Sequence, residues 1–204
     1  MLVIGAGGHA SVCIDVLQSG GERVLGCLSD DGVARRPLPV AVLGLDSEVD
    51  RFIADGLDRL FVAVGDNRTR LLLIERCLAS GAQVINAVSP HAVVSPSVTF
   101  GVGVVLMAGA VVNAGASLGD GLIVNTNASV DHDADLGRGA HVCPGCAVAG
   151  DVAVGEGALL GVGSSVAPGR KVGAWATIGA GAAVVHDIPD GVVAVGVPAR
   201  SVVA

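Results

Sequence analysis

The sequence places a histidine between two carboxylates, Asp131-His132-Asp133, and a second histidine, His141, follows nine residues later. Imidazole titrates near neutral pH, so it can accept a proton from a reacting group. A carboxylate on the other ring nitrogen would fix the tautomer of the ring without taking the proton itself. The residues alone leave two interpretations open for each histidine: a proton acceptor in a reaction, or a polar side chain on a solvated surface.

The pair Cys143-Pro-Gly-Cys146 has the spacing of a metal or redox motif and lies just after His141. A structural zinc site needs four converging ligands, and the sequence offers no fourth. Both cysteines also fit the repeat described next, where Cys146 takes the position of a small residue. We therefore expect no metal. The five cysteines, an odd number at irregular spacing, do not suggest a disulfide framework either.

The elements that carry these residues follow a six-residue repeat. Every sixth residue from Val94 to Val184 is large and apolar, and the residue two places earlier is usually small, as at Ala128 and Ala140. A period of six fits neither an α-helix at 3.6 nor a lone strand at 2. It is typical of a parallel β-helix, in which three hexads close one triangular coil of 18 residues and the apolar side chains fill the axis.

The first part of the chain has a different pattern. We expect strands at residues 2–4, 23–28, 59–64 and 83–86, with helices at 9–19 and 69–80, which together predict a small parallel α/β sheet. Gly5-x-Gly7-x-x-Ala10 lies between the first strand and helix, and its glycines would let a phosphate approach the helix N-terminus. A tight turn without a ligand is the alternative. This Rossmann-like half domain, residues 1–88, is too short for a full dinucleotide site, and the β-helix takes up residues 89–204.

The composition of the chain limits the kinds of partner that we expect it to bind. The net charge is −7 with a single lysine, Lys171, which argues against nucleic acid as the main partner. Hydrophobic residues make up 51% of the chain, but Gly, Asn and Asp interrupt every apolar run before it could span a membrane. No basic segment or cleavage signal precedes the first strand, so we expect a cytoplasmic location without membrane insertion.

Five motifs together resemble the hexapeptide-repeat sugar acetyltransferases of the bacillosamine, perosamine and sialic acid pathways. They are residues 2–10 (Leu-Val-Ile-Gly-Ala-Gly-Gly-His-Ala), Gly65-Asp66-Asn67 with Arg70, Val124-Asn125-Thr126, Asp131-His132-Asp133, and residues 196–200 (Gly-Val-Pro-Ala-Arg). The resemblance covers essentially the whole chain. It implies a left-handed β-helix that binds acetyl-CoA, an N-terminal domain that binds a nucleotide-linked amino sugar, and a homotrimer with an active site at each junction between subunits.

The resemblance also implies roles for individual residues. His132 matches the general base, Asp133 the carboxylate that orients it, and Asn125 a polar residue of the same cleft. His141, Val162 and Ala180 match positions that border acetyl-CoA. The expected contacts to the sugar nucleotide are Gly7, Gly8 and His9 at the phosphates, Asp30 or Asp31 at the base or ribose, and Asp66 and Asn67 near the acceptor.

These residues predict an acetyl-CoA-dependent N-acetyltransferase in which the amine attacks the thioester directly. O-acetylation of sialic acid or a related sugar is the alternative, and the identities of the nucleotide base and of the sugar stay open.

Two further classes of protein are alternatives to an acetyltransferase. A γ-type carbonic anhydrase needs three converging histidines, a pattern that the spacing from His132 to His141 does not supply. A non-catalytic scaffold would bind ligands without releasing free thiol.

Overall fold

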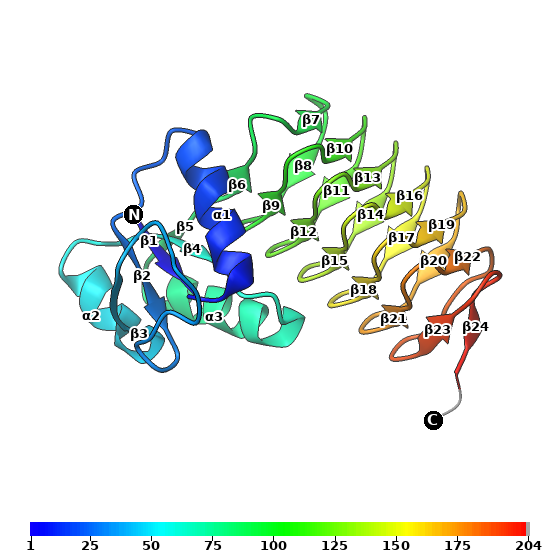
Figure 1. The fold of residues 1–204 in the computed structure, drawn as a ribbon. Coiled ribbons are helices and arrows are strands. Elements are labelled where there is room, and N and C mark those ends of the chain that lie inside the picture. The colour runs from blue at the N-terminus through cyan, green and yellow to red at the C-terminus, as the bar shows by residue number, and fades with distance from the viewer. Residues whose placement is uncertain (203–204) are drawn as a thin grey trace. The chain divides into compact units, whose positions relative to one another are not determined.

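The computed structural model describes residues 1–202, and the chain divides into two compact units, Met1–Pro90 and His91–Ala204 (Figure 1). The first unit contains β1 (Leu2–Ile4), α1 (Gly8–Ser19), β2 (Gly26–Ser29), β3 (Val42–Leu45), η1 (Asp46–Glu48), α2 (Val49–Ala54), β4 (Arg59–Val62), α3 (Asn67–Ala79), β5 (Gln83–Val84) and β6 (Ala87–Val88). None of the helices in this described part of the chain has the length and apolarity that crossing a bilayer requires.

The first unit is built on a parallel sheet with the strand order β3-β2-β1-β4-β5. All three residues of β1 are buried, because this strand lies between β2 and β4 and is covered on both faces. The chain extends the sheet to one side of β1 through β2 and β3, and then crosses to the other side with β4. In open parallel sheets such a reversal places a crevice outside the carboxyl ends of the central strands.

The sequence did not reveal every element of this unit. β3, η1 and α2 were not predicted, and the second strand begins at Gly26 rather than at residue 23. β3 is an edge strand of four residues whose side chains alternate between half-buried and exposed. Its apolar run, which begins at Val40, is as apolar as β1, and our prediction overlooked it.

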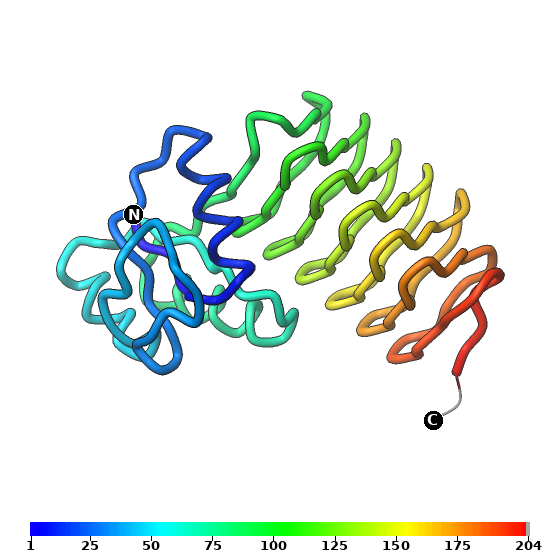
Figure 2. Tube along the Cα trace, viewed as in Figure 1, coloured from blue at the N-terminus to red at the C-terminus, as the bar shows by residue number. Residues whose placement is uncertain are grey.

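The second unit is a parallel β-helix with three faces (Figure 2). Face 1 contains β7 (Val93–Val94), β10 (Val111–Val112), β13 (Ser129–Val130), β16 (Ala147–Val148), β19 (Ser165–Val166) and β22 (Ala183–Val184). Face 2 contains β8 (Thr99–Phe100), β11 (Ser117–Leu118), β14 (Asp135–Leu136), β17 (Ala153–Val154) and β20 (Lys171–Val172). Face 3 contains β9 (Val105–Leu106), β12 (Ile123–Val124), β15 (His141–Val142), β18 (Leu159–Leu160), β21 (Thr177–Ile178), β23 (Val193–Val195) and β24 (Arg200–Ser201), the last pair being antiparallel.

The register of this unit confirms the six-residue repeat. Val112 lies beside Val130, and Val130 beside Val148, so each coil adds 18 residues. The aliphatic residues from Leu106 to Val184 fill one continuous core together with the small residues two places before them. Phe100 is the exception, with 39% of its surface exposed. It lies on the first strand of face 2, so no earlier coil of that face covers it.

Candidate active site

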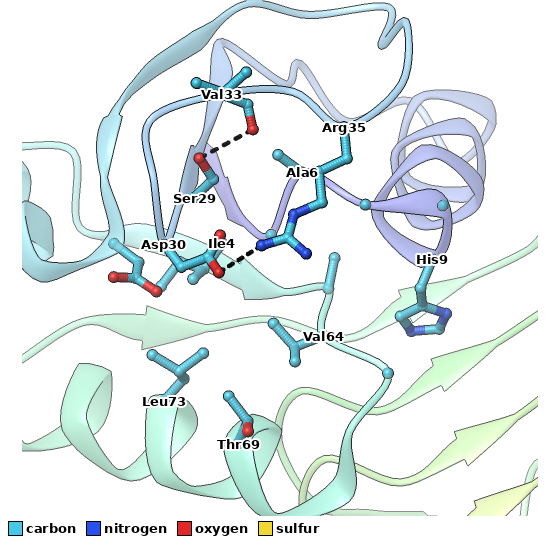
Figure 3. A pocket seen from close by; sticks show the side chains of 16 residues that line it. Ile4, Ala6, His9, Ser29, Asp30, Val33, Arg35, Val64, Thr69 and Leu73 are labelled. Atoms are coloured by element: carbon cyan, nitrogen blue, oxygen red, sulfur yellow. Dashed lines mark hydrogen bonds and ion pairs between the residues drawn. The ribbon is translucent and has the colours of Figure 1, made fainter.

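A cavity of about 350 Å³ opens at the carboxyl ends of β1, β2, β3 and β4. Its lining consists of Ile4, Gly5, Ala6, Gly7, Gly8, His9, Ser29, Asp30, Val33, Arg35, Asp46, Ala63, Val64, Gly65, Thr69 and Leu73. Figure 3 shows Asp30 and Arg35 on one wall, Val64, Thr69 and Leu73 on the opposite wall, and His9 at one end. Of the residues predicted to contact a nucleotide, Gly7, Gly8, His9 and Asp30 line this cavity.

The glycine turn from β1 to α1 leaves the helix N-terminus accessible. Gly5 has a φ of +124°, and a Cβ on it would come 2.5 Å from the carbonyl oxygen of Ala63, so the close approach of β1 to β4 requires glycine there. Gly7 is the N-cap and provides no side chain to satisfy the first backbone N–H groups of α1. These donors, together with the helix dipole, favour an anionic ligand at this end of the cavity.

Charged side chains also line the cavity. Arg35 donates a hydrogen bond of 2.8 Å from its guanidinium to Asp30, and both groups are largely exposed. Asp46, which the sequence did not single out, joins the lining from the end of β3, the strand that was not predicted. Asp31 does not line the cavity. It accepts a hydrogen bond of 3.0 Å from the backbone N–H of Val33 and so holds its own loop.

Asp66 and Asn67 do not belong to the cavity lining. Asp66 caps α3, accepting hydrogen bonds of 2.8 Å from the backbone N–H and 2.7 Å from the hydroxyl of Thr69, and these bonds lower the pKa of the Asp66 carboxyl. Asn67 is buried, and its side-chain oxygen accepts a hydrogen bond of 2.8 Å from Arg70. That Asp66 and Asn67 contact the acceptor stays a prediction. In the structure, both side chains make hydrogen bonds to nearby residues at the start of α3.

His9 is a neutral residue of the cavity. Its Nε2 lies 3.4 Å from the Sγ of Cys13 one helical turn later. Burial, and then the charge of Arg70, lower the pKa of His9 to about 4. At neutral pH this imidazole can therefore give or accept a hydrogen bond, but it brings no positive charge to a ligand.

In the second unit, the turns between faces 1 and 2 form a corner that we call the His132 corner, residues 113–116, 131–134, 149–152 and 167–170. The Nδ1 of His132 lies 2.9 Å from a carboxylate oxygen of Asp133. A carboxylate only accepts, so Nδ1 carries the hydrogen and the lone pair lies on Nε2. Asp133 has a φ of +58°, a left-handed conformation that most turns of the column give to glycine.

The surroundings of His132 raise its basicity and leave its Nε2 accessible. The hydrogen bond that His132 donates to Asp133, and then the charge of Asp131, raise the pKa of His132, and the charge of Asp151 acts in the same direction. A Cβ on Gly150, one coil further on, would lie 2.6 Å from Nε2. Gly150 therefore leaves room for the imidazole ring of His132 to lie against the next coil, while 61% of the His132 side chain stays exposed.

The turns between faces 3 and 1 form a second corner, which we call the Asn125 corner, residues 125–128, 143–146, 161–164 and 179–182. The backbone N–H of Thr126 donates to the side-chain oxygen of Asn125 at 2.8 Å, so the amide NH₂ of Asn125 faces the Nε2 of His141 at 3.1 Å. Since NH₂ only donates, His141 Nε2 accepts this bond. Val162 and Ala180 are exposed on the same corner, with Val162 exposed to 56%.

Within one chain, the predicted catalytic and acetyl-CoA residues thus lie on two different corners of the prism. His132 and Asp133 occupy one, while Asn125 and Val162 belong to the other, which His141 contacts from β15. Asn125 contacts His141 and makes no hydrogen bond to His132 among the described residues. One chain by itself therefore does not bring all of these side chains together.

The cysteines of the Asn125 corner are packed as small core residues. Cys146 Sγ lies 3.2 Å from the hydroxyl of Ser164. Burial raises the pKa of Cys143, and it raises that of Cys146 to about 11, so both thiols stay protonated at neutral pH. Over residues 1–202, no three or more His, Cys, Asp or Glu side chains converge in a way that could hold a metal ion.

Comparison with known proteins places this geometry in a family. The model of the PglD N-terminal domain family matches residues 1–77. A crystal structure of a histidine variant of perosamine N-acetyltransferase from Caulobacter crescentus, in complex with CoA and GDP-perosamine, is 46% identical over 100% of this chain and 96% of that chain, with a TM-score of 0.96. The acetyltransferase domain of PglB from Neisseria gonorrhoeae, in complex with acetyl coenzyme A, is 37% identical over 98% of each chain, with a TM-score of 0.92.

One match is partial. An uncharacterized protein of Acanthamoeba polyphaga mimivirus is 30% identical over 101 residues, which is 50% of this chain and only 20% of that protein. The similarity to the two bacterial acetyltransferases instead extends over nearly the full length of both partners, as the motifs in the sequence predict. The chain belongs to the family of hexapeptide-repeat sugar acetyltransferases that includes perosamine N-acetyltransferase and the PglB acetyltransferase domain.

Proposed function

We propose that this protein transfers the acetyl group of acetyl-CoA to the amino group of a nucleotide-linked amino sugar, with His132 as the general base. The observation that carries the proposal is the His132–Asp133 hydrogen bond of 2.9 Å, which leaves the Nε2 lone pair available on a side chain that is 61% exposed. His141 fits the base less well, because its Nε2 already accepts a hydrogen bond from Asn125. The complex of perosamine N-acetyltransferase with CoA and GDP-perosamine supports both substrates.

The proposed reaction needs no covalent enzyme intermediate. The neutral amine of the sugar attacks the thioester carbonyl carbon, a C–N bond forms, and the carbonyl oxygen becomes an oxyanion. His132 Nε2 accepts a proton from the new ammonium group, and Asp133 stabilises the resulting imidazolium through Nδ1. The oxyanion then re-forms the carbonyl as the C–S bond breaks, and the thiolate of CoA takes the proton from the His132 imidazolium, so that the products are the acetamido sugar and CoA and the base is neutral again.

Each of the two units would bind one of the two substrates. The cavity of the first unit, residues 1–88, fits a nucleoside diphosphate, with its phosphates at the N-terminus of α1 and its base or ribose near Asp30. The β-helix of residues 89–204 would bind acetyl-CoA along the Asn125 corner, beside His141, Val162 and Ala180. We also infer that the helix winds left-handedly and that the first unit is a Rossmann-like half domain, as the parallel order β3-β2-β1-β4-β5 supports.

A homotrimer would complete the site. If three β-helices pack side by side, the His132 corner of one chain can meet the Asn125 corner of the next. The base and the thioester, which one chain keeps on separate corners, would then share one cleft. His132 has 61% of its side chain exposed in the single chain, which leaves it free to face a neighbour.

The proposal is tested by incubating the purified protein with acetyl-CoA and GDP-perosamine, and with UDP- and dTDP-linked 4-amino sugars for comparison. We expect free thiol release that depends on the amino sugar, together with a sugar nucleotide whose mass has increased by one acetyl group. Binding of both ligands without thiol release would support a scaffold instead. Acetylation of a sialic acid hydroxyl, with all of the amino sugars unreactive, would replace N- by O-acetylation.

Replacing His132 by alanine should reduce kcat by about 10²–10⁴-fold, because a positioned general base typically contributes this factor. The affinity for acetyl-CoA should change little, since we assign its binding to the Asn125 corner. Steady-state kinetics and calorimetric titration with acetyl-CoA measure the two effects. If the variant kept its kcat, or lost acetyl-CoA binding and its fold together, His132 would not be the base.

The pH profile of kcat/KM should show an acid limb above the ordinary histidine pKa of about 6.5. His132 must be neutral to accept a proton, and its pKa is raised, so activity is low below that pKa and increases with pH through it. Asp133→Asn should move the limb to lower pH, because the variant loses the hydrogen-bonded carboxylate.

Asp135→Asn is the matched control for the pH experiment. Asp135 is an exposed carboxylate two residues further on, at the start of β14, and it is not among the groups that shift the pKa of His132. Its replacement should leave the acid limb in place. An Asp133→Asn profile that coincides with that of Asp135→Asn would assign the limb to another group.

A further inference from the structure

Asp46 is a carboxylate of the cavity to which the proposed reaction assigns no role. It follows β3 directly, it is half-buried, and it belongs to the cavity lining. Within residues 1–202 its carboxylate takes part in no hydrogen bond or ion pair. Arg76 is the cation whose pKa it influences. That pKa is raised mainly by the hydrogen bond of 2.8 Å from Arg76 to Asp50, and the charge of Asp46 adds least to it.

The other carboxylates at this edge of the sheet are already engaged. Asp30 accepts a hydrogen bond of 2.8 Å from Arg35, and Asp31 accepts one of 3.0 Å from the backbone N–H of Val33. Hydrogen bonds to a carboxylate become stronger as the carboxylate is withdrawn from water. The half-buried Asp46 therefore offers two acceptor oxygens to the donors of a ligand.

The order of the strands places Asp46 where the base of a nucleotide would lie. β1, β2 and β3 are neighbours in the sheet, and their carboxyl ends lead to the α1 turn, to Asp30 and to Asp46 in that order. Neighbouring strands are about 4.8 Å apart, so the end of β3 lies about 10 Å from the end of β1. With its phosphates at α1 and its ribose at Asp30, a nucleotide would extend its base toward the end of β3.

Apolar side chains complete this part of the cavity. Figure 3 shows Val33 and Leu73 on opposite sides of it. These two side chains provide apolar surfaces against which a flat aromatic ring can pack.

A carboxylate at the edge of such a ring favours guanine over the other bases. Guanine presents two adjacent donors, N1–H and the N2 amino group, and a carboxylate can accept both at once. Adenine and cytosine place a ring-nitrogen acceptor beside their amino group, and uracil and thymine place a carbonyl oxygen on each side of their N–H. These acceptors would face the negative charge of the carboxylate, so only guanine matches both of its oxygens.

We propose that Asp46 selects guanine, accepting hydrogen bonds from N1–H and from the N2 amino group, and that the substrate is a GDP-linked amino sugar. This inference rests on the proposed function, because it takes the ligand of the cavity to be a nucleoside diphosphate sugar. It identifies the base that the sequence left open, and it assigns the base to Asp46 and the ribose to Asp30.

Calorimetric titrations with GDP, inosine diphosphate (IDP) and xanthosine diphosphate (XDP) test this assignment. IDP lacks the N2 amino group, so wild-type protein should bind it about tenfold or more weakly than GDP, because one hydrogen bond to a charged acceptor is lost. XDP has a carbonyl oxygen in place of that amino group. Asp46→Asn should bind XDP more tightly than GDP, because the amide NH₂ donates to this oxygen while the amide oxygen still accepts N1–H.

Asp30→Asn is the matched control. It makes the same change at another carboxylate of the cavity lining. Because we assign Asp30 to the ribose, which GDP and XDP share, this variant should weaken the two ligands by similar factors and keep GDP the tighter one. A general loss of stability would not reverse the order of GDP and XDP in either variant.

The outcomes are distinguishable. Equal affinities of wild-type protein for GDP and IDP, or an Asp46→Asn variant that still prefers GDP to XDP, would overturn the role of Asp46. If Asp46→Asn does not fold, the wild-type protein decides: tighter binding of GDP than of IDP and UDP supports the proposal. Tighter binding of UDP or dTDP contradicts it and leaves the proposed function intact. A wild-type protein that binds no nucleoside diphosphate refutes the proposed function itself, and the inference with it.

Discussion

The stacking of one apolar side chain on the next along the axis of the β-helix is the constraint on which the rest of the second unit depends. Because Val130 lies beside Val148, and Val142 beside Leu160, each coil repeats after 18 residues without a break in register. The register decides which residues share a corner. It places Gly150 one coil after His132, and it places the turn that follows His141 one coil after Asn125. A shift of one residue would move every aliphatic side chain out of the core.

Both units use the same device, a backbone that approaches closely because a glycine has no side chain. Gly5 lets β1 come against Ala63 and turn toward α1, whose first turn has no side-chain cap. Gly150 leaves room for the ring of His132 to lie against the next coil. The surroundings then shift the pKa values of the two histidines in opposite directions. Carboxylates around His132 raise its pKa, whereas burial, together with the charge of Arg70, lowers the pKa of His9. Of these two histidines, His132 therefore gains a proton more readily than a free histidine, and His9 less readily.

Much of this could be predicted from the sequence, because the six-residue period is local and repeats over many coils, and the glycine turn has a short signature between a strand and a helix. What escaped prediction depends on contacts between distant segments. Asp46 reaches the cavity only because β3, which was not predicted, pairs with β2, and Asp31 turns away because it binds the backbone of Val33. The separation of His132 from Asn125 follows from which turn each occupies, and spacing alone did not disclose it.

The central claim is that the active site joins the His132 corner of one chain to the Asn125 corner of another, and subunit complementation tests it most directly. Chains with His132→Ala and chains with His141→Ala are coexpressed with different tags, and mixed oligomers are purified through both tags. The account predicts that mixed oligomers regain part of the wild-type activity that each variant lacks alone, since an intact His132 can then meet an intact His141 on a neighbouring chain. Mixed oligomers as inactive as their parents would contradict it.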